Sequence, residues 1–128
     1  MVEADKERIT QVLYNLLENA VKFSKDNSTV STIIWKQNQE DGVNKGKDLL
    51  QQKPAEAVVK IQDTGVGIHH DMLPRLFTKF ATQSFTGTGL GLYISRSIIE
   101  AHGGKIWAQN NSDGKGATFA FSLPLFKL

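Results

Sequence analysis

The chain has 128 residues, and its 15 lysines and arginines against 13 aspartates and glutamates leave a formal net charge of +2. A composition of 40% hydrophobic and 22% charged residues is typical of a packed protein, so we expect one domain over residues 1–128. The small charge argues against nucleic acid as a partner, and the absence of cysteine excludes thiolate zinc sites and a nucleophilic thiol.

The chain begins with the pattern of a long helix. Apolar residues recur at helical spacing from Asp5 to Phe23, and Asp5 fits the N-cap position. Residues 28–35 are rich in β-branched side chains, which predicts a short strand. Residues 36–56 are polar and longer than most connections in compact domains, so we expect a solvated insertion.

Glycine and proline mark the boundaries in the middle of the chain. Residues 57–63 predict a second strand, which runs into a glycine-rich turn. Residues 71–80 predict a short helix with Pro74 near its start, and residues 81–87 a short flexible segment.

The last part of the chain predicts a helix and two strands. Residues 90–101 have one apolar face and end at Gly103 and Gly104, which is typical of a helix with a glycine C-cap. Residues 105–109 and 117–123 predict strands joined by a hairpin loop. Two layers, with helices on one face of a sheet, are the simplest way to bury all these apolar faces.

A polar stripe follows one side of the first predicted helix. Asn15, Asn19 and Lys22 lie at positions i, i+4 and i+7, within roughly 60° of one another. Carboxamide oxygens beside a lysine suit a magnesium ion and its phosphates, because magnesium takes few protein ligands and keeps its waters. Alternatively, the stripe is a solvated helix face, and the three residues alone leave both interpretations open.

A carboxylate and two glycines stand at the end of the second predicted strand, in the sequence Asp63-Thr64-Gly65-Val66-Gly67. The carboxylate can accept a hydrogen bond from an exocyclic amine, which adenine has and guanine lacks at the corresponding position. The glycines would let the backbone pass close to a flat ring. The alternative is an ordinary tight turn that contains an aspartate.

A second glycine-rich segment leads directly into the second long helix, and it reads Gly87-Thr88-Gly89-Leu90-Gly91-Leu92. The free N–H groups and the dipole of that helix favour a phosphate. The sequence contains no Walker P-loop, and the segment lacks the spacing and preceding strand of a dinucleotide-binding motif. A flexible hinge before a helix is the alternative.

The histidines show no pattern of metal binding. His69 and His70 follow the glycine turn, no metal spacing links them with carboxylates, and we expect both to be exposed. His102 lies at the end of the second long helix, where we expect it to interact with the helix C-terminus. Phe77 and Phe80 are expected to anchor the core, or to fix one edge of a lid over a nucleotide.

In this order, the motifs resemble those of the GHKL superfamily of ATP-binding proteins. Residues 15–23 look like its N box, residues 63–67 like its G1 box, residues 77–80 like its F box and residues 87–92 like its G2 box. Residues 93–106 and 114–119 look like those of sensor histidine kinases in particular. The resemblance covers about residues 5–123.

The resemblance implies a two-layer α/β (α+β) sandwich with a mixed sheet covered on one face by three helices, and with ATP between the helices and a lid. Asn19 would be the main Mg²⁺ ligand, assisted by Asn15, and Lys22 would meet the phosphates, so Asn19 and Lys22 are the expected catalytic residues. Asp63 would accept a hydrogen bond from the adenine amino group. The other expected nucleotide contacts are Phe23, Gly65, Gly67, Ile68, Lys79, Gly87, Thr88, Gly89, Leu90, Gly91 and Leu92.

One position separates the branches of this superfamily. Members that hydrolyse ATP have a glutamate four residues before the magnesium-binding asparagine, and that position is Asn15 here. Glu18 is one residue before Asn19 and would face about 100° away from it. A general base for water is therefore missing from its expected place, which favours a phosphoryl donor that spares ATP until an acceptor arrives.

The resemblance also implies protein partners. The acceptor histidine of such kinases lies on a separate dimerisation domain, and a response regulator receives the phosphate from the full-length protein. No residues before Met1 could form that domain, so we expect an excised catalytic domain that is inactive without it. His70-Asp71 superficially resembles an acceptor site, but it follows the G1 turn and we reject it.

Two features depart from the family pattern. The predicted lid, residues 81–86, contains no arginine, so Lys79 or a partner would have to supply the cation for the γ-phosphate. The polar insertion over residues 36–56 would be either inert or a docking surface.

The leading hypothesis is the ATP- and Mg²⁺-binding catalytic domain of a histidine kinase. The alternatives are a regulatory ATP-binding module without transfer activity and an anti-sigma-type serine kinase of the same superfamily. No run of about 18 apolar residues occurs, and the charged start does not resemble a signal peptide. We expect a cytoplasmic domain without direct membrane contact, although the parent protein could be membrane-anchored.

Overall fold

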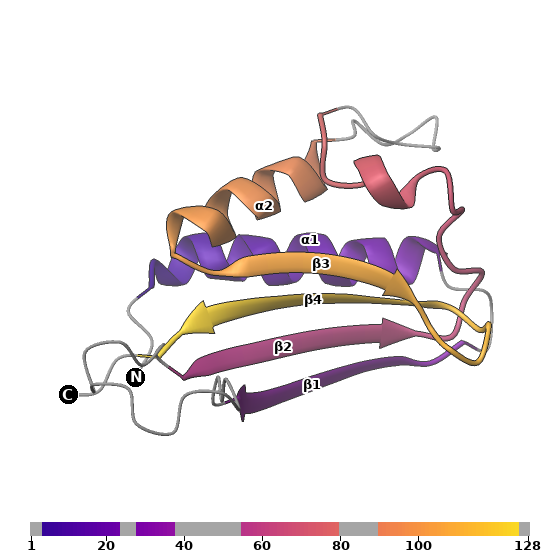
Figure 1. The fold of residues 1–128 in the computed structure, drawn as a ribbon, viewed down its shortest axis with the longest axis horizontal. Helices are drawn as coiled ribbons and strands as arrows, with labels where there is room; N and C mark the ends of the chain where they lie inside the picture. Colours follow the sequence, from indigo (N-terminus) through magenta and orange to yellow (C-terminus); the bar gives the residue numbers. More distant parts are fainter. Residues whose placement is uncertain (1–3, 24–27, 38–54, 80–89, 126–128) are drawn as a thin grey trace, which may run out of the picture.

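A four-stranded sheet and two α-helices form two layers, with both helices on one face of the sheet (Figure 1). The computed structural model describes residues 4–23, 28–37, 55–79 and 90–125. Its elements are α1 (Lys6–Phe23), β1 (Val30–Gln37), β2 (Glu56–Asp63), the 3-10 helix η2 (Leu73–Arg75), α2 (Gly91–Ala101), β3 (Lys105–Asn110) and β4 (Ala117–Pro124). The predicted two-layer α/β sandwich is confirmed.

The predicted third helix, over residues 71–80, is wrong in its extent, because among the described residues 71–79 only η2 is helical. Three successive i→i+3 hydrogen bonds join the N–H groups of Met72, Arg75 and Thr78 to the carbonyl groups of His69, Met72 and Arg75, at 2.9, 3.1 and 3.0 Å. Pro74 lies in the first turn of η2 and has no N–H group to donate. This segment is therefore a run of tight turns, and Phe80 and residues 81–87 lie outside the described residues.

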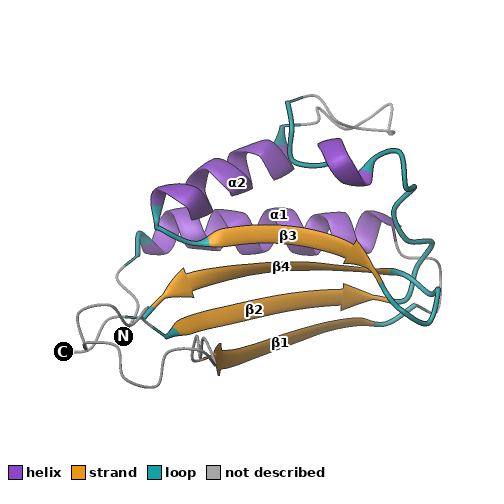
Figure 2. Cartoon of the chain, in the orientation of Figure 1, coloured by secondary structure: helices purple, strands orange, loops and turns teal. Residues whose placement is uncertain are grey.

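The sheet has the order β1-β2-β4-β3, and every neighbouring pair is antiparallel (Figure 2). The expected mixed sheet is therefore wrong for the described strands. Strands β1 and β2 form one antiparallel pair and β3 and β4 form another, and such consecutive pairs need no helical crossover. The pairing of β2 with β4 joins the two pairs into one sheet. Gln62 pairs with Thr118, and Asn110 pairs with Ala117. The end of β2 thus lies beside the loop between β3 and β4.

The core lies between the helices and one face of the sheet. It contains Val12, Leu16 and Ala20 of α1, Leu92 and Ile99 of α2, and Val59, Ile61, Phe119 and Phe121 of the sheet. These positions recur every four residues along α1 and every two along the strands, which are the spacings of a buried helix face and a buried sheet face. None of the helices in the described ranges has the length and apolar character of a membrane span.

The two α-helices are linked at their ends. Oδ1 of Asp5 accepts hydrogen bonds from the N–H groups of Glu7 and Arg8, at 3.0 and 3.2 Å, which confirms the predicted N-cap. The Nδ1 of His102 lies 2.7 Å from the carbonyl oxygen of Ile98, and its Nε2 accepts the N–H of Asp5 at 3.1 Å. The expected contact of His102 with the C-terminus of α2 is therefore confirmed, and the same ring also holds the start of α1.

Candidate functional site

Two of the predicted motifs meet where α1 packs against α2. The Nδ2 of Asn15 donates to the carbonyl oxygen of Gly91 and to Oγ of Ser95, both at 3.3 Å. The Ser95 hydroxyl donates in turn to the same carbonyl oxygen at 2.9 Å. Ser95 is fully buried, and because Gly91 begins α2, this cluster holds the first turn of α2 against the polar stripe of α1.

Asn19 and Lys22 continue the stripe towards the C-terminal end of α1. Asn19 is half-buried, and its carboxamide makes no hydrogen bond to another residue that the structure describes, whereas Lys22 is exposed. The Asn19 side-chain oxygen is thus available to a ligand, whereas Nδ2 of Asn15 already donates hydrogen bonds to α2. The side chain of Phe23 lies outside the described part of the chain.

Asp63 ends β2 inside the protein, with only 1% of its surface exposed. Its Oδ1 accepts hydrogen bonds from the N–H groups of Gly65 and Ala117, at 2.9 and 3.3 Å. Its Oδ2 is also buried and has no partner among the described residues. A buried acceptor without a donor is costly, so this atom indicates a donor on a ligand. An ionised carboxylate only accepts, which suits an exocyclic amino group.

Two asparagines that the sequence analysis missed fix Asp63 and the loop after it. Asn110 binds Ile68 twice, accepting its N–H at 2.7 Å and donating to its carbonyl oxygen at 2.8 Å. Asn111 donates to the carbonyl oxygens of Asp63 and Lys115, at 2.9 and 2.7 Å. Consecutive asparagines at a strand end are a turn signal. That signal does not identify their partners, because Ile68 and Asp63 lie 42 and 48 positions away.

Two glycines with positive φ let the loops at this end pass close together. Gly67 has φ +78°, and a Cβ there would lie 2.9 Å from Oδ1 of Asn110. Gly116 has φ +80°, and a Cβ there would lie 2.1 Å from the carbonyl oxygen of Asp63. Residues with a side chain rarely adopt this φ, so glycine fits both positions. Gly67 was predicted as a site residue, whereas Gly116 was considered only as part of a hairpin loop and of the family-like segment over residues 114–119.

The glycine-rich segment before α2 is described from Leu90 onward, and Gly87, Thr88 and Gly89 lie outside the described residues. The side chain of Leu92 packs in the core, so only its backbone is left for a ligand. The first N–H groups of an α-helix have no partner within the helix, and no side chain caps the start of α2. The start of α2 can therefore bind an anion.

Lys79 lies beside the first turn of α2. Its Nζ is 5.1 Å from the centroid of the Tyr93 ring, within the range of a cation–π contact. The predicted phosphate-binding cation is therefore close to the helix end that favours an anion.

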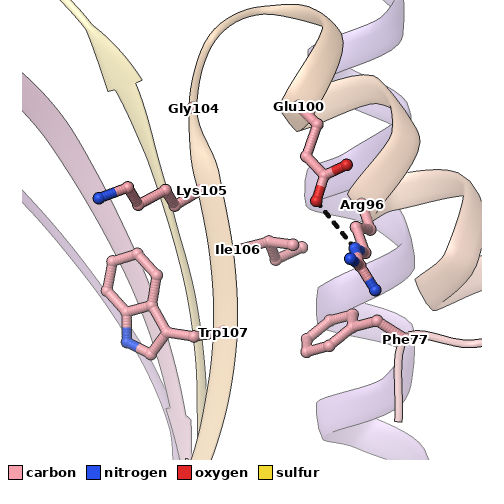
Figure 3. Close-up of a pocket in the computed structure, with 7 residues that line it drawn as sticks. All are labelled: Phe77, Arg96, Glu100, Gly104, Lys105, Ile106 and Trp107. Carbon is pink, nitrogen blue, oxygen red and sulfur yellow. Dashed lines mark hydrogen bonds and ion pairs between the residues drawn. The ribbon is translucent and has the colours of Figure 1, made fainter. Parts of the chain in front are cut away.

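A separate pocket of about 380 Å³ lies between α2 and β3 (Figure 3). It is lined by Phe77, Arg96, Glu100, Gly104, Lys105, Ile106 and Trp107. Nε of Arg96 donates to Oε1 of Glu100 at 2.8 Å, and this hydrogen bond and the charge of Glu100 raise the pKa of Arg96. Ile106 points towards Arg96 and Phe77 in Figure 3. None of the predicted nucleotide or metal residues lines this pocket, although Phe77 belongs to the expected F box.

Residues 4–127 match the family described as histidine kinase-, DNA gyrase B-, and HSP90-like ATPase. The chain is 41% identical over 124 residues to the sensor protein FixL of Bradyrhizobium diazoefficiens, covering 97% of this chain and 22% of FixL. It therefore spans less than a quarter of the length of that relative.

Two solved structures have the same fold. The mycobacterial sensor histidine kinase MprB superposes with a TM-score of 0.74 at 25% identity, over 96% of this chain and 76% of MprB. Full-length ShkA in complex with AMPPNP superposes with a TM-score of 0.70 at 28% identity, over 99% of this chain and 23% of ShkA.

Proposed function

This chain belongs to the family of histidine kinase-, DNA gyrase B-, and HSP90-like ATPases, and from this premise we propose that it binds ATP with Mg²⁺ and donates the γ-phosphoryl group to a histidine. That histidine would lie on the dimerisation domain of a sensor kinase in a two-component system. A response regulator would receive the phosphoryl group from the full-length protein, and this domain would act in the cytoplasm.

The observation that carries the proposal is the buried, unpartnered Oδ2 of Asp63. Adenine presents an amino group where guanine presents a carbonyl oxygen, so a buried acceptor favours ATP over GTP. The hydrogen bonds that Oδ1 accepts from Gly65 and Ala117 hold the carboxylate in one orientation. The similarity to ShkA, whose structure contains the ATP analogue AMPPNP, supports a nucleotide as the ligand.

The stripe on α1 supplies the groups for magnesium and phosphate. Asn19 offers an amide oxygen, and Asn15 offers its Oδ1 because its Nδ2 is directed at α2. Neutral oxygens suit Mg²⁺, which when bound would neutralise phosphate charge. Lys22 and the N–H groups at the start of α2 would hold the phosphates themselves.

Asn15 favours transfer to a histidine over hydrolysis. Its amide cannot take a proton from water, so this position provides no general base. In the transfer, a bond forms between the acceptor imidazole nitrogen and the γ-phosphorus while the bond to the bridging oxygen breaks, and ADP leaves. The chain contributes by positioning the phosphates and stabilising their charge.

Calorimetric titration with Mg²⁺ and non-hydrolysable analogues of ATP and GTP tests the binding step. We expect saturable binding of the ATP analogue and much weaker binding of the GTP analogue. Equal affinity for both analogues would contradict the role of Asp63, and no binding at millimolar concentration would contradict the nucleotide site.

Incubation with γ-labelled ATP and a purified dimerisation domain tests the transfer step. We expect acid-labile phosphohistidine on the added domain. Acid-stable phosphoserine on a partner would instead identify a serine kinase. Nucleotide binding without any transfer would identify a regulatory module.

A further inference from the structure

His69, His70 and Asp71 form a compact cluster of metal-ligating side chains directly after the glycine turn. One ligand atom from each lies within 4.8 Å of the other two. Nδ1 of His69 is 3.5 Å from Oδ2 of Asp71, and Nε2 of His70 is 3.2 Å from Oδ1 of the same carboxylate. Each carboxylate oxygen therefore faces an imidazole nitrogen.

The three side chains lie near enough to one another to reach a single tetrahedral ion. Zinc binds nitrogen and oxygen at about 2.0–2.2 Å, so two of its tetrahedral ligands are about 3.3–3.6 Å apart. The nitrogen–oxygen distances of 3.5 and 3.2 Å run to different oxygens of Asp71, and the two imidazole rings are stacked at an interplanar angle of 24°, so the exposed side chains turn to bring all three ligand atoms onto one ion. Two imidazoles and one carboxylate suit borderline transition metals better than Mg²⁺ or Ca²⁺, which prefer oxygen ligands alone.

The backbone that carries the cluster is held on both sides. Asn110 makes two hydrogen bonds to Ile68, the residue before the cluster. Met72, the residue after it, is buried, and its N–H donates to the carbonyl oxygen of His69 at 2.9 Å. Little backbone freedom would be lost on binding an ion, which lowers the entropic cost.

The geometry points to a site for a divalent transition metal ion of the Zn²⁺ class, with His69, His70 and Asp71 as ligands and water completing the shell. An ion on Nδ1 of His69 replaces the hydrogen bond that this atom accepts from the N–H of Asp71 at 3.2 Å. Sequence spacing predicted no metal site here, and the tight turn brings the three side chains together. The site does not use the proposed magnesium ligands on α1.

Titration of tag-free, nucleotide-free protein with Zn²⁺ tests the site by calorimetry near neutral pH, where imidazole can ligate. We expect one ion per chain. His69→Gln, His70→Gln and Asp71→Asn should each weaken the affinity by at least about tenfold, because losing even an outer-shell partner costs about 10–100-fold. The double variant His69→Gln/His70→Gln should lose saturable binding.

His102→Gln is the matched control, because both ring nitrogens of His102 already have partners in Asp5 and Ile98. Circular dichroism checks its folding, and its Zn²⁺ affinity should equal that of the parent chain. In NMR spectra, Zn²⁺-dependent shifts should centre on residues 69–71. Zn²⁺ binding that survives in the double variant, or no saturable binding below about 1 mM, overturns the site. Neither result depends on whether the chain binds ATP.

Discussion

The two ends of the proposed nucleotide site are built differently. At the end of β2, Asp63 is buried and tied by hydrogen bonds to Gly65, Ala117 and Asn111. On α1, Asn19 is half-buried, and Lys22 is exposed at the helix surface. The proposed base contact is therefore part of the hydrogen-bonded framework, whereas the proposed phosphate contacts are side chains that can change without disturbing the core. We expect substitutions at the first end to affect stability and selectivity, and those of Asn19 and Lys22 at the second end to affect affinity alone.

The largest expected effect comes from Gly116→Ala. The added Cβ would meet the carbonyl oxygen of Asp63, at a positive φ that alanine disfavours. We expect a loss of at least about 2 kcal/mol in the free energy of unfolding, measured by urea denaturation.

Gly114→Ala is the matched control for this substitution. Gly114 has φ +77°, and nothing lies within 4 Å of a Cβ added there. Only the backbone strain of about 1–2 kcal/mol remains. Equal losses in the two variants would show that the approach of Gly116 to Asp63 contributes nothing.

Asp63→Asn is expected to have the next largest effect. An amide can keep one acceptor oxygen for Gly65 and Ala117, but it places a donor where Oδ2 would face the adenine amino group. We expect affinity for the ATP analogue to fall about 10–100-fold, as for a lost charged hydrogen bond. Calorimetry should also show reduced selectivity over the GTP analogue. Asp113→Asn, at an exposed carboxylate, should leave both unchanged.

Asn19→Ala and Asn15→Ala separate binding from stability on α1. We expect Asn19→Ala to lose magnesium-dependent nucleotide binding with the thermal midpoint retained. Asn15→Ala removes the hydrogen bonds to Gly91 and Ser95 and should lower stability by about 1 kcal/mol. Calorimetry with and without Mg²⁺, beside thermal denaturation, measures both effects. Unchanged affinity in Asn19→Ala would remove that residue from its assigned role.

The smallest expected effect is that of Lys79→Met. An exposed charge pair contributes about 0.2–1 kcal/mol, so the preference for the ATP analogue over ADP should fall by about 1.4- to 5-fold. Competition binding measures this ratio. Lys6→Met, at the start of α1, provides the control. A ratio that is the same in both variants would exclude Lys79 as the cation for the γ-phosphate.

Local patterns were sufficient to predict most of the secondary structure. Val12 and Leu16 are buried in α1 at the spacing that predicted the helix, and Asp5 caps it. The pattern was insufficient at residues 71–80, where Pro74 and i→i+3 hydrogen bonds give a 3-10 helix. The hydrogen bonds in this segment join residues three positions apart and not four, so the turns do not continue as an α-helix.

The roles of Asn19 and Asp63 towards a nucleotide remain predictions. The structure does show which residues around Asp63 the sequence pattern had indicated. Gly67 has the positive φ that a glycine in a tight turn allows. The contacts of Asn110, Asn111 and Gly116 were not predicted, because nothing in the sequence around them indicates that Ile68 or Asp63 is their partner.

The sequence by itself determined the amphipathic helices, the strands and the order of the motifs, because side-chain periodicity and turn residues act over a few positions. Only the tertiary structure decided that the sheet is antiparallel, that the Asp63 carboxylate accepts from Ala117, 54 positions away, and that Asn15 holds the first turn of α2. These contacts form only when β2 pairs with β4 and α1 packs against α2. A buried polar atom gains or lacks a partner according to that packing, which no local pattern specifies.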